Sequence, residues 1–168
     1  MKSVTVHSPG TVANLVCGFD ILGLALAAPY DSMRLSFRAA PGVEIINHDG
    51  FGLPAEPEKN VAGVVLLSIL EKWKEPVGFR MEITKQIKPG SGIGSSAASA
   101  AGAAVAANEL LGRPFDTNAL VQFAMNGEKL ASGVKHADNI APCILGGVSL
   151  IRSIHPLDIV SIPAPELY

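Results

Sequence analysis

The stretch of sequence most suited to chemistry is a run rich in glycine and serine that lies between two apolar segments. Its members are Pro89, Gly90, Ser91, Gly92, Ile93, Gly94, Ser95, Ser96, Ala97, Ala98 and Ser99. Glycine lets the backbone approach a ligand closely, and the N–H groups and dipole at the start of a helix attract an anion. Serine hydroxyls can cap that helix, bond a phosphate or coordinate Mg²⁺. The run therefore predicts a phosphate-binding loop at a helix N-terminus.

A second interpretation of this run is a glycine-rich turn that caps a buried helix, since such loops are a weak signal by themselves. The run is not a Walker A motif, because it lacks the Gly-Lys-Ser/Thr ending. It is not a Rossmann fingerprint, because Gly90, Gly92 and Gly94 have the wrong spacing and no acidic ribose partner is evident. Eight alanines in residues 95–111 would let the following helix pack closely on a sheet and hold its first turn rigidly.

The elements that must position this run are predicted from hydrophobic periodicity. Apolar patterning predicts strands at residues 2–7, 33–38, 42–46, 79–87 and 148–151. Helical spacing predicts helices at residues 59–73, 95–111 and 117–131, the last with Asp116 as its N-cap. We expect loops at residues 47–57 and 89–94, which are rich in glycine and proline. Strands and helices without regular alternation indicate an α+β fold.

Composition limits the classes of function. The 168 residues are 48% hydrophobic and carry a formal net charge of −2, which argues against general disorder and against a basic protein that binds nucleic acid or membranes. No apolar run is long enough to span a bilayer, and no signal peptide is evident. Cys17 and Cys143 lack metal-site spacing and predict free thiols in a reducing compartment. We therefore expect a cytoplasmic protein that handles something small.

Together with two further segments, the phosphate loop resembles the GHMP kinase superfamily. Residues 89–97 are similar to the phosphate loop of that superfamily, and residues 8–26 and 136–147 resemble its homoserine kinase branch. Three motifs in the same order argue against a chance match. The resemblance implies an α+β fold of the ribosomal protein S5 domain 2-like type, in which a mixed sheet packs against helices.

The activity that the resemblance implies is ATP-dependent phosphorylation of the L-homoserine hydroxyl to O-phospho-L-homoserine, a step of threonine biosynthesis. ATP and Mg²⁺ would be the cofactors and L-homoserine the small-molecule partner. A homodimer of the full-length protein would be compatible with the resemblance, although no residue indicates one. Two alternatives stay open: another GHMP small-molecule kinase, and a noncatalytic nucleotide-binding module of the same fold.

The resemblance also sets an expectation for domain organisation. Chains of this branch are roughly twice as long, more than one domain on the usual length prior. Residues 1–168 are therefore expected to form the N-terminal ATP-binding domain, with the C-terminal domain missing. We expect this chain alone to have little or no activity.

A substrate site follows from the resemblance as well. It implies that Asn14, Asp20, His136 and Asn139 bind the amino acid substrate. The alternatives are Asx-type loop caps for Asn14 and Asp20 and a structural role for His136. If residues 136–139 are helical, three-residue spacing places His136 and Asn139 on one face. Phe19 is expected in the core.

For the nucleotide and the metal, the resemblance implies that Asn60 contacts the adenine and that Ser96 and Glu128 hold Mg²⁺. The alternatives are a helix N-cap for Asn60 and a solvated glutamate beside Lys129 for Glu128. An acidic residue near a helix C-terminus opposes the helix dipole, which favours a tertiary role for Glu128.

The expected catalytic residue is Asn139, which occupies the position of the catalytic aspartate in mevalonate kinase-like relatives, counting back from Gly146 and Gly147. An amide cannot act as a general base at neutral pH. Asp138 is its neighbour and would point elsewhere on a helix. We therefore predict no dedicated base: Asn139 would hold the attacking hydroxyl, and a loose phosphoryl-transfer transition state needs little base assistance.

Overall fold

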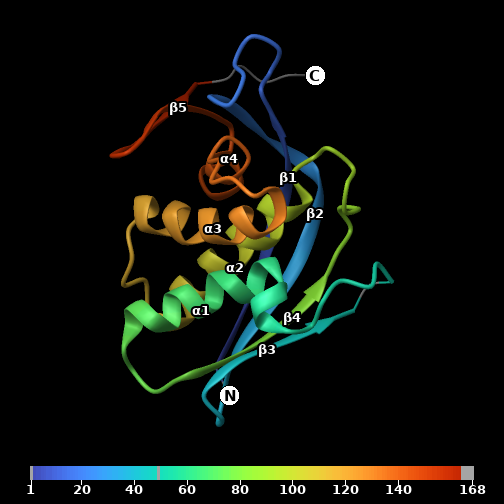
Figure 1. Ribbon diagram of the computed structural model, residues 1–168, viewed down its shortest axis with the longest axis vertical. Coiled ribbons are helices and arrows are strands. Elements are labelled where there is room, and N and C mark those ends of the chain that lie inside the picture. Colours follow the sequence, from blue (N-terminus) through green and yellow to red (C-terminus); the bar gives the residue numbers. More distant parts are fainter. Residues whose placement is uncertain (1, 49, 164–168) are drawn as a thin grey trace.

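The computed structural model describes residues 2–48 and 50–163, and its helices lie on one face of a mixed sheet (Figure 1). The strands are β1 (Ser3–Ala13), β2 (Leu22–Arg38), β3 (Gly42–Asn47), β4 (Gly78–Thr84), β5 (Val148–Ile154) and β6 (Leu157–Ile162). The helices are the short 3-10 turn η1 (Pro57–Lys59), α1 (Val61–Trp73), α2 (Ser95–Leu111), α3 (Thr117–Ser132) and α4 (Ile140–Leu145). The α+β fold is confirmed. Residues 1, 49 and 164–168 of the expected domain lie outside the described residues.

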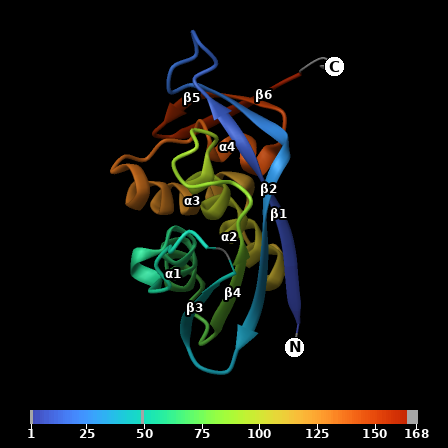
Figure 2. The ribbon, with the colours of Figure 1, turned by 90° about the vertical axis from the view of Figure 1, so that its right-hand side faces the viewer.

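One long strand, β2, organises the sheet. The strand order is β3–β4–β2–β5–β6, and β1 also pairs with β2. The second half of β2 runs antiparallel to β4, whereas its first residues pair with β5. Strands β3 and β4 are parallel, which makes the sheet mixed. In Figure 2, β1 and β2 run the height of the molecule and connect the two ends of the sheet.

Helix α2 is the buried centre of the fold. It packs against β1 and β2 and against α1 and α3, and all eight of its alanines are buried. A β-carbon on Gly102 would lie 2.3 Å from Met33 Sδ, so the helix and β2 lie too close for a larger side chain. Because small side chains bring these layers together, the first turn of α2 is fixed against the sheet. Within the described ranges, no helix combines the length and apolarity needed to cross a membrane.

The predicted helices agree closely with the structure. The helix at residues 95–111 is α2, and Asp116 caps α3 by accepting a 2.8 Å hydrogen bond from the Ala119 N–H. Helix α1 begins at Val61, later than predicted, because Pro57–Lys59 forms a separate 3-10 turn before it. The loop at residues 89–94 is confirmed.

The strands differ more from the prediction. Strand β1 continues past a bulge between Pro9 and Thr11, because it stays paired with β2 on both sides of that bulge. Strand β2 begins at Leu22 and is much longer than its alternating pattern indicates, and β6 is not predicted at all. Phe19 is not in the core but 72% exposed, because the chain leaves the sheet after Ala13 and projects as a loop at one end of the molecule (Figure 1).

Candidate active site

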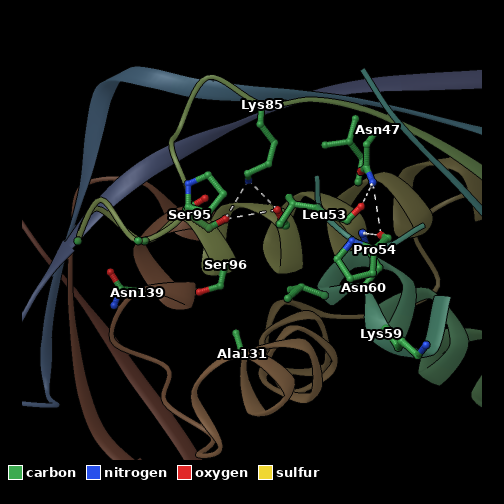
Figure 3. A pocket seen from close by; sticks show the side chains of 17 residues that line it. Asn47, Leu53, Pro54, Lys59, Asn60, Lys85, Ser95, Ser96, Ala131 and Asn139 are labelled. Atoms are coloured by element: carbon green, nitrogen blue, oxygen red, sulfur yellow. Dashed lines mark hydrogen bonds between the residues drawn. The ribbon is translucent and has the colours of Figure 1, made fainter. Parts of the chain in front are cut away.

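A cavity of about 450 Å³ opens beside the predicted phosphate loop. Figure 3 shows Ser96 and Asn139 at one end and, at the other, Asn47, Pro54, Lys59 and Asn60. Lys85 and Ser95 lie along the side between these ends, and Ala131 of α3 closes the opposite side. The residues come from distant parts of the chain, so only the folded sheet and helices assemble this cavity.

Glycine gives the phosphate loop its shape. Gly90, Gly92 and Gly94 have φ angles of 75°, 81° and 66°, in the left-handed region that glycine adopts without strain. Gly94 is the N-cap of α2, and no side chain among the described residues caps that helix start. Ala97 and Ala98 are fully buried and do not line the cavity, and the Ala98 N–H donates to the Gly94 carbonyl at 2.8 Å. The backbone donors of the first turn are therefore left for an anion or for water.

Two serine hydroxyls in this region make hydrogen bonds within the protein, and a third faces the cavity. Ser95 Oγ donates to the Ile87 carbonyl at 2.9 Å, which uses its hydroxyl to close the loop. Ser99 Oγ donates to the Ser95 carbonyl at 3.3 Å and accepts from Lys85 Nζ at 2.9 Å. Ser96 lies at the cavity, as Figure 3 shows. Of these three hydroxyls, that of Ser96 is the one placed to meet a ligand.

Behind the loop lies a buried ion pair that the sequence analysis missed. Lys85 Nζ donates to Asp31 Oδ2, and the two side chains are 1% and 0% exposed. Lys85 also donates to the Ser95 carbonyl at 3.1 Å, whereas Asp31 Oδ1 accepts from the N–H groups of Gln86 and Ile87 at 2.8 and 3.0 Å. These bonds divert the chain after β4, which therefore ends earlier than predicted. They also tie the start of α2 to β2.

A sequence signal for this pair exists. Asp31 precedes the buried Met33 by two residues, and Lys85 follows the buried Ile83 by two, so both continue the buried face of a strand. Charged residues are almost never fully buried unless they are paired. Two opposite charges that follow the alternation of buried strand residues therefore indicate an ion pair, although they do not tell which segments meet.

Asn60 has partners at both ends of its amide. Its Oδ1 accepts from the N–H groups of Ala62 and Gly63 at 3.0 and 3.2 Å, and its Nδ2 donates to the Pro54 carbonyl at 2.7 Å. The N-cap interpretation is therefore confirmed. Asn60 also lines the cavity, at the end away from Asn139 (Figure 3), where a contact with adenine stays a prediction.

Glu128 and Ser96 form a donor set that fits a divalent cation. Burial raises the pKa of Glu128, and Asp138 adds to the rise, while a hydrogen bond with Ser96 and the nearby His136 oppose it. Glu128 Oε2 is buried and has no hydrogen-bond partner among the described residues, so Glu128 is not simply solvated. Mg²⁺ takes one or two carboxylates and fills its remaining positions with phosphate oxygens and water. A lone buried carboxylate oxygen beside a serine hydroxyl matches that requirement.

The four residues expected to bind substrate are brought together in part. Asp20 Oδ1 lies 3.7 Å from His136 Nδ1, and the Asp20 N–H donates to Asn14 Oδ1 at 2.8 Å. Asn14 is thus also a loop cap, as the alternative interpretation expected. Asn139 lines the cavity, whereas the other three lie outside its lining. Asn14 and Asp20 lie in the loop that follows β1, and His136 lies beside Asp20 in the chain before α4.

The stretch before α4 is not the predicted single helical face. Residues 136–139 precede the helix, and Asn139 is its N-cap residue, so His136 reaches Asp20 through the tertiary fold. Asp138 is 4% exposed, and its Oδ1 accepts from the Asn139 N–H at 3.1 Å. Burial raises the pKa of Asp138, and the negative charge of Asp20 raises it further. The hydrogen bond from the Asn139 N–H and the nearby His136 act in the opposite direction.

Comparison with known proteins decides the family. The family model described as GHMP kinases N terminal domain matches residues 60–147, which include the phosphate loop, Glu128 and Asn139. This chain belongs to the GHMP kinase family. The expectation from the three motifs is therefore confirmed.

Among the relatives of this GHMP kinase chain are several proteins named homoserine kinase. One from Chlorobium phaeobacteroides strain BS1 is 44% identical over 99% of this chain and 56% of its own length, and one from Chloroherpeton thalassium is 45% identical over 100% and 57%. The solved homoserine kinase from Cytophaga hutchinsonii is 45% identical, with a TM-score of 0.91 over 98% of this chain and 53% of that one. The chain thus spans about half the length of the curated relatives it matches.

Structures with lower identity share the fold of this GHMP kinase domain. The mevalonate kinase of Methanococcus jannaschii is 14% identical, with a TM-score of 0.74 over 97% of this chain. At that identity the likeness shows the fold alone. The mixed sheet with helices on one face is thus retained across GHMP kinases of divergent sequence.

We expect Glu128→Gln to stabilise this GHMP kinase domain when no metal is present. The folded pKa of Glu128 lies above its ordinary value of 4.5, so the folded state keeps this proton to higher pH than the unfolded chain. The free energy of unfolding therefore falls as pH rises from the unfolded towards the folded pKa. The glutamine side chain has no charge to desolvate, so the variant should be more stable than the wild type at neutral pH, and this difference should shrink at acidic pH.

Urea unfolding at acidic and at neutral pH, with a chelator present, measures this difference. Glu71→Gln on the exposed side of α1 is the matched control and should change stability little at either pH. Equal stability of Glu128→Gln and the wild type at both pH values would contradict the prediction.

Proposed function

We propose that this protein transfers the γ-phosphate of ATP to the hydroxyl of L-homoserine, giving ADP and O-phospho-L-homoserine. The observation that carries the proposal is the 45% identity to a solved homoserine kinase over 98% of the chain, which spans all three motifs. The cavity beside the phosphate loop supports it, because glycine conformation and free helix N–H groups suit a nucleotide polyphosphate. Residues 1–168 would act as the ATP-binding domain.

The proposed nucleotide lies along the cavity. Its phosphates would take the free backbone N–H groups of the loop and of the first turn of α2, where the dipole favours negative charge. Its base would occupy the end near Asn60, Pro54 and Asn47. Val61 also lines this end and supplies apolar surface for a flat ring.

A magnesium ion would be held by Ser96 and Glu128. When bound, it would neutralise charge on the phosphates during transfer. The unpartnered Glu128 Oε2 is the structural support for this assignment. Binding of the ion would also offset the cost of keeping this carboxylate buried and charged.

The amino acid substrate would bind where the loop after β1 meets the chain before α4. The exposed Asp20 carboxylate suits an ammonium group, and His136 and Asn14 add polar contacts. Asn139 would hold the attacking hydroxyl at the end of the cavity next to Ser96 (Figure 3). In the transfer, the hydroxyl oxygen forms a bond to the γ-phosphorus, the bond to the leaving ADP oxygen breaks, and the proton passes to a phosphate oxygen. A loose transition state needs no stronger base.

Substrate identity is tested by ADP release from the full-length protein with L-homoserine, mevalonate, galactose and L-serine. We expect release with L-homoserine and much less with the other three. Release with mevalonate but not L-homoserine would move the protein to another branch of the family. Nucleotide binding without release for any alcohol would favour a noncatalytic module.

We expect Asp138→Asn to lower kcat by less than about tenfold, because Asp138 is not a general base in the proposed mechanism. Loss of a general base usually lowers the rate by about 10²- to 10⁴-fold. The asparagine keeps an oxygen that can accept from the Asn139 N–H, so the local backbone bond survives. Steady-state kinetics of the full-length variant measure the effect. A loss of turnover with unchanged affinity for L-homoserine would restore a base role for Asp138.

We also propose that the protein is cytoplasmic. The exposed thiol of Cys17 is free, which suits the reducing cytoplasm. A homodimer of the full-length protein is a further prediction from the resemblance, and sedimentation of the purified protein tests it.

A further inference from the structure

We propose that Thr11 is a positioning residue that fixes the side-chain amide of Asn139, so that the amide presents its N–H groups to the attacking hydroxyl. Thr11 lies on β1, far in sequence from the phosphate loop and from Asn139. The inference rests on the proposed phosphoryl transfer and names the residue that orients its catalytic amide.

Thr11 is held rigidly at the meeting point of three elements. Its hydroxyl donates to Asn139 Oδ1 at 2.8 Å, and its backbone N–H donates to the Ile93 carbonyl of the phosphate loop at 3.1 Å. The residue is 0% exposed. A β-carbon on Gly94 would lie 2.1 Å from Thr11 Oγ1, so the loop presses directly on this hydroxyl. One threonine therefore couples β1, the phosphate loop and the Asn139 amide.

The Asn139 side chain does not stabilise the start of its own helix. Asn139 occupies the N-cap position of α4 but makes no side-chain cap hydrogen bond there. Its oxygen is taken by Thr11, which leaves the NH₂ group, a donor, for the cavity that Asn139 lines. In Figure 3 the Asn139 side chain lies below the phosphate loop, on the same side of the cavity as Ser96.

This orientation has a chemical consequence. An NH₂ group can donate to a lone pair of the attacking oxygen, but it cannot accept that hydroxyl's proton. The second lone pair is then free to attack phosphorus, and the proton passes to a phosphate oxygen. Without the Thr11 hydroxyl, the Asn139 amide could turn its oxygen to the cavity and hold the substrate hydroxyl by its proton, in the wrong orientation for attack.

The test compares Thr11→Val, which keeps the shape but removes the hydroxyl, with Thr11→Ser, which keeps the hydroxyl. In the full-length protein we expect Thr11→Val to lower kcat about 10- to 100-fold, the scale of a misplaced reacting group, with KM for ATP within about twofold. Thr11→Ser should recover kcat to within about threefold of the wild type, because it restores the donor. Thr5→Val, at an exposed position of the same strand, is the matched control.

A double-mutant cycle separates positioning from a structural role. If Thr11 acts through Asn139, Thr11→Val should lower kcat little further in an Asn139→Ala background. An equal loss in both backgrounds, or a Thr11→Ser variant as impaired as Thr11→Val, would overturn the inference. If Thr11→Val does not fold, Thr11→Ala takes its place in the cycle. A wild type that does not phosphorylate L-homoserine overturns the proposed function instead, so the two failures are distinct.

Discussion

Replacing Gly94 with alanine should weaken ATP binding by about 10- to 100-fold, the scale of one lost hydrogen bond to a charged group. Gly94 has a φ angle of 66°, which strains any residue with a β-carbon. That β-carbon would also lie 2.1 Å from Thr11 Oγ1 and 3.1 Å from Asn139 Oδ1. Thr11 is fully buried and bonded through its backbone to Ile93, so it cannot move aside cheaply. The loop must shift instead, and its N–H groups would no longer converge on the phosphates.

Gly112→Ala is the matched control for this experiment. Gly112 ends the same helix with a φ angle of 90°, and nothing lies within 4 Å of the β-carbon it would gain. The control should therefore show the conformational cost of a positive φ, about 1–2 kcal/mol of stability, without a change in ATP affinity. Calorimetric titration of each variant with ATP and Mg²⁺ gives the affinities, and thermal unfolding shows that each is folded. Comparable ATP affinities for Gly94→Ala and Gly112→Ala would refute the assignment of residues 89–99 to the phosphates.

Replacing Asp31 with alanine should cost about 3–5 kcal/mol of stability, because it leaves the Lys85 ammonium buried without its counter-charge. The variant also strips the N–H groups of Gln86 and Ile87 of their shared acceptor. The free energy of unfolding of a native domain is only about 5–15 kcal/mol, so this loss is a large fraction of the total. Because Lys85 also holds the Ser95 carbonyl, the start of α2 should loosen as well.

Partial rescue would identify the buried charge as the cause. The double variant Asp31→Leu with Lys85→Met removes both charges and should recover part of the lost stability, since apolar replacements of buried pairs are often tolerated. Recovery should be incomplete, because the two backbone N–H groups still lack an acceptor. Glu109→Ala, which breaks an exposed pair with Arg113, is the control and should cost under about 1 kcal/mol. Urea unfolding measures all four proteins, and an Asp31→Ala loss no larger than that of Glu109→Ala would disprove the account.

Features whose cause lies within a few neighbouring residues were predicted correctly from the sequence. Helix α2 follows from its alanines, from the glycine run before it and from Gly112 after it. The cap at Asp116 follows from one carboxylate at the right place. The GHMP family likewise follows from contiguous motifs, and the shape of the loop before α2 follows from its glycines. In each case the physical cause, a backbone preference or a local hydrogen bond, lies inside the segment itself.

The strands and the interior of the site were harder to predict, for one physical reason. The length of β2 depends on partners on both of its sides, from β1, β4 and β5, because a strand is completed by hydrogen bonds that other segments supply. Ser95 was predicted as a phosphate ligand, yet its hydroxyl closes the loop onto Ile87. The sequence shows that a hydroxyl is present in the glycine-rich run, but it does not show which group that hydroxyl will bond.

The sequence by itself determined the family, the helices α1, α2 and α3, and the glycine-rich loop for which we propose a phosphate-binding role. Only the tertiary structure decided how charges and hydroxyls pair inside. The Lys85–Asp31 bond joins residues 54 apart in sequence, and the Thr11–Asn139 bond joins residues 128 apart. No local pattern specifies such partners, because they meet only after β1, β2 and β4 have aligned and α2 has packed against them. Buried polar groups must then be satisfied by whatever the packed layers bring within reach.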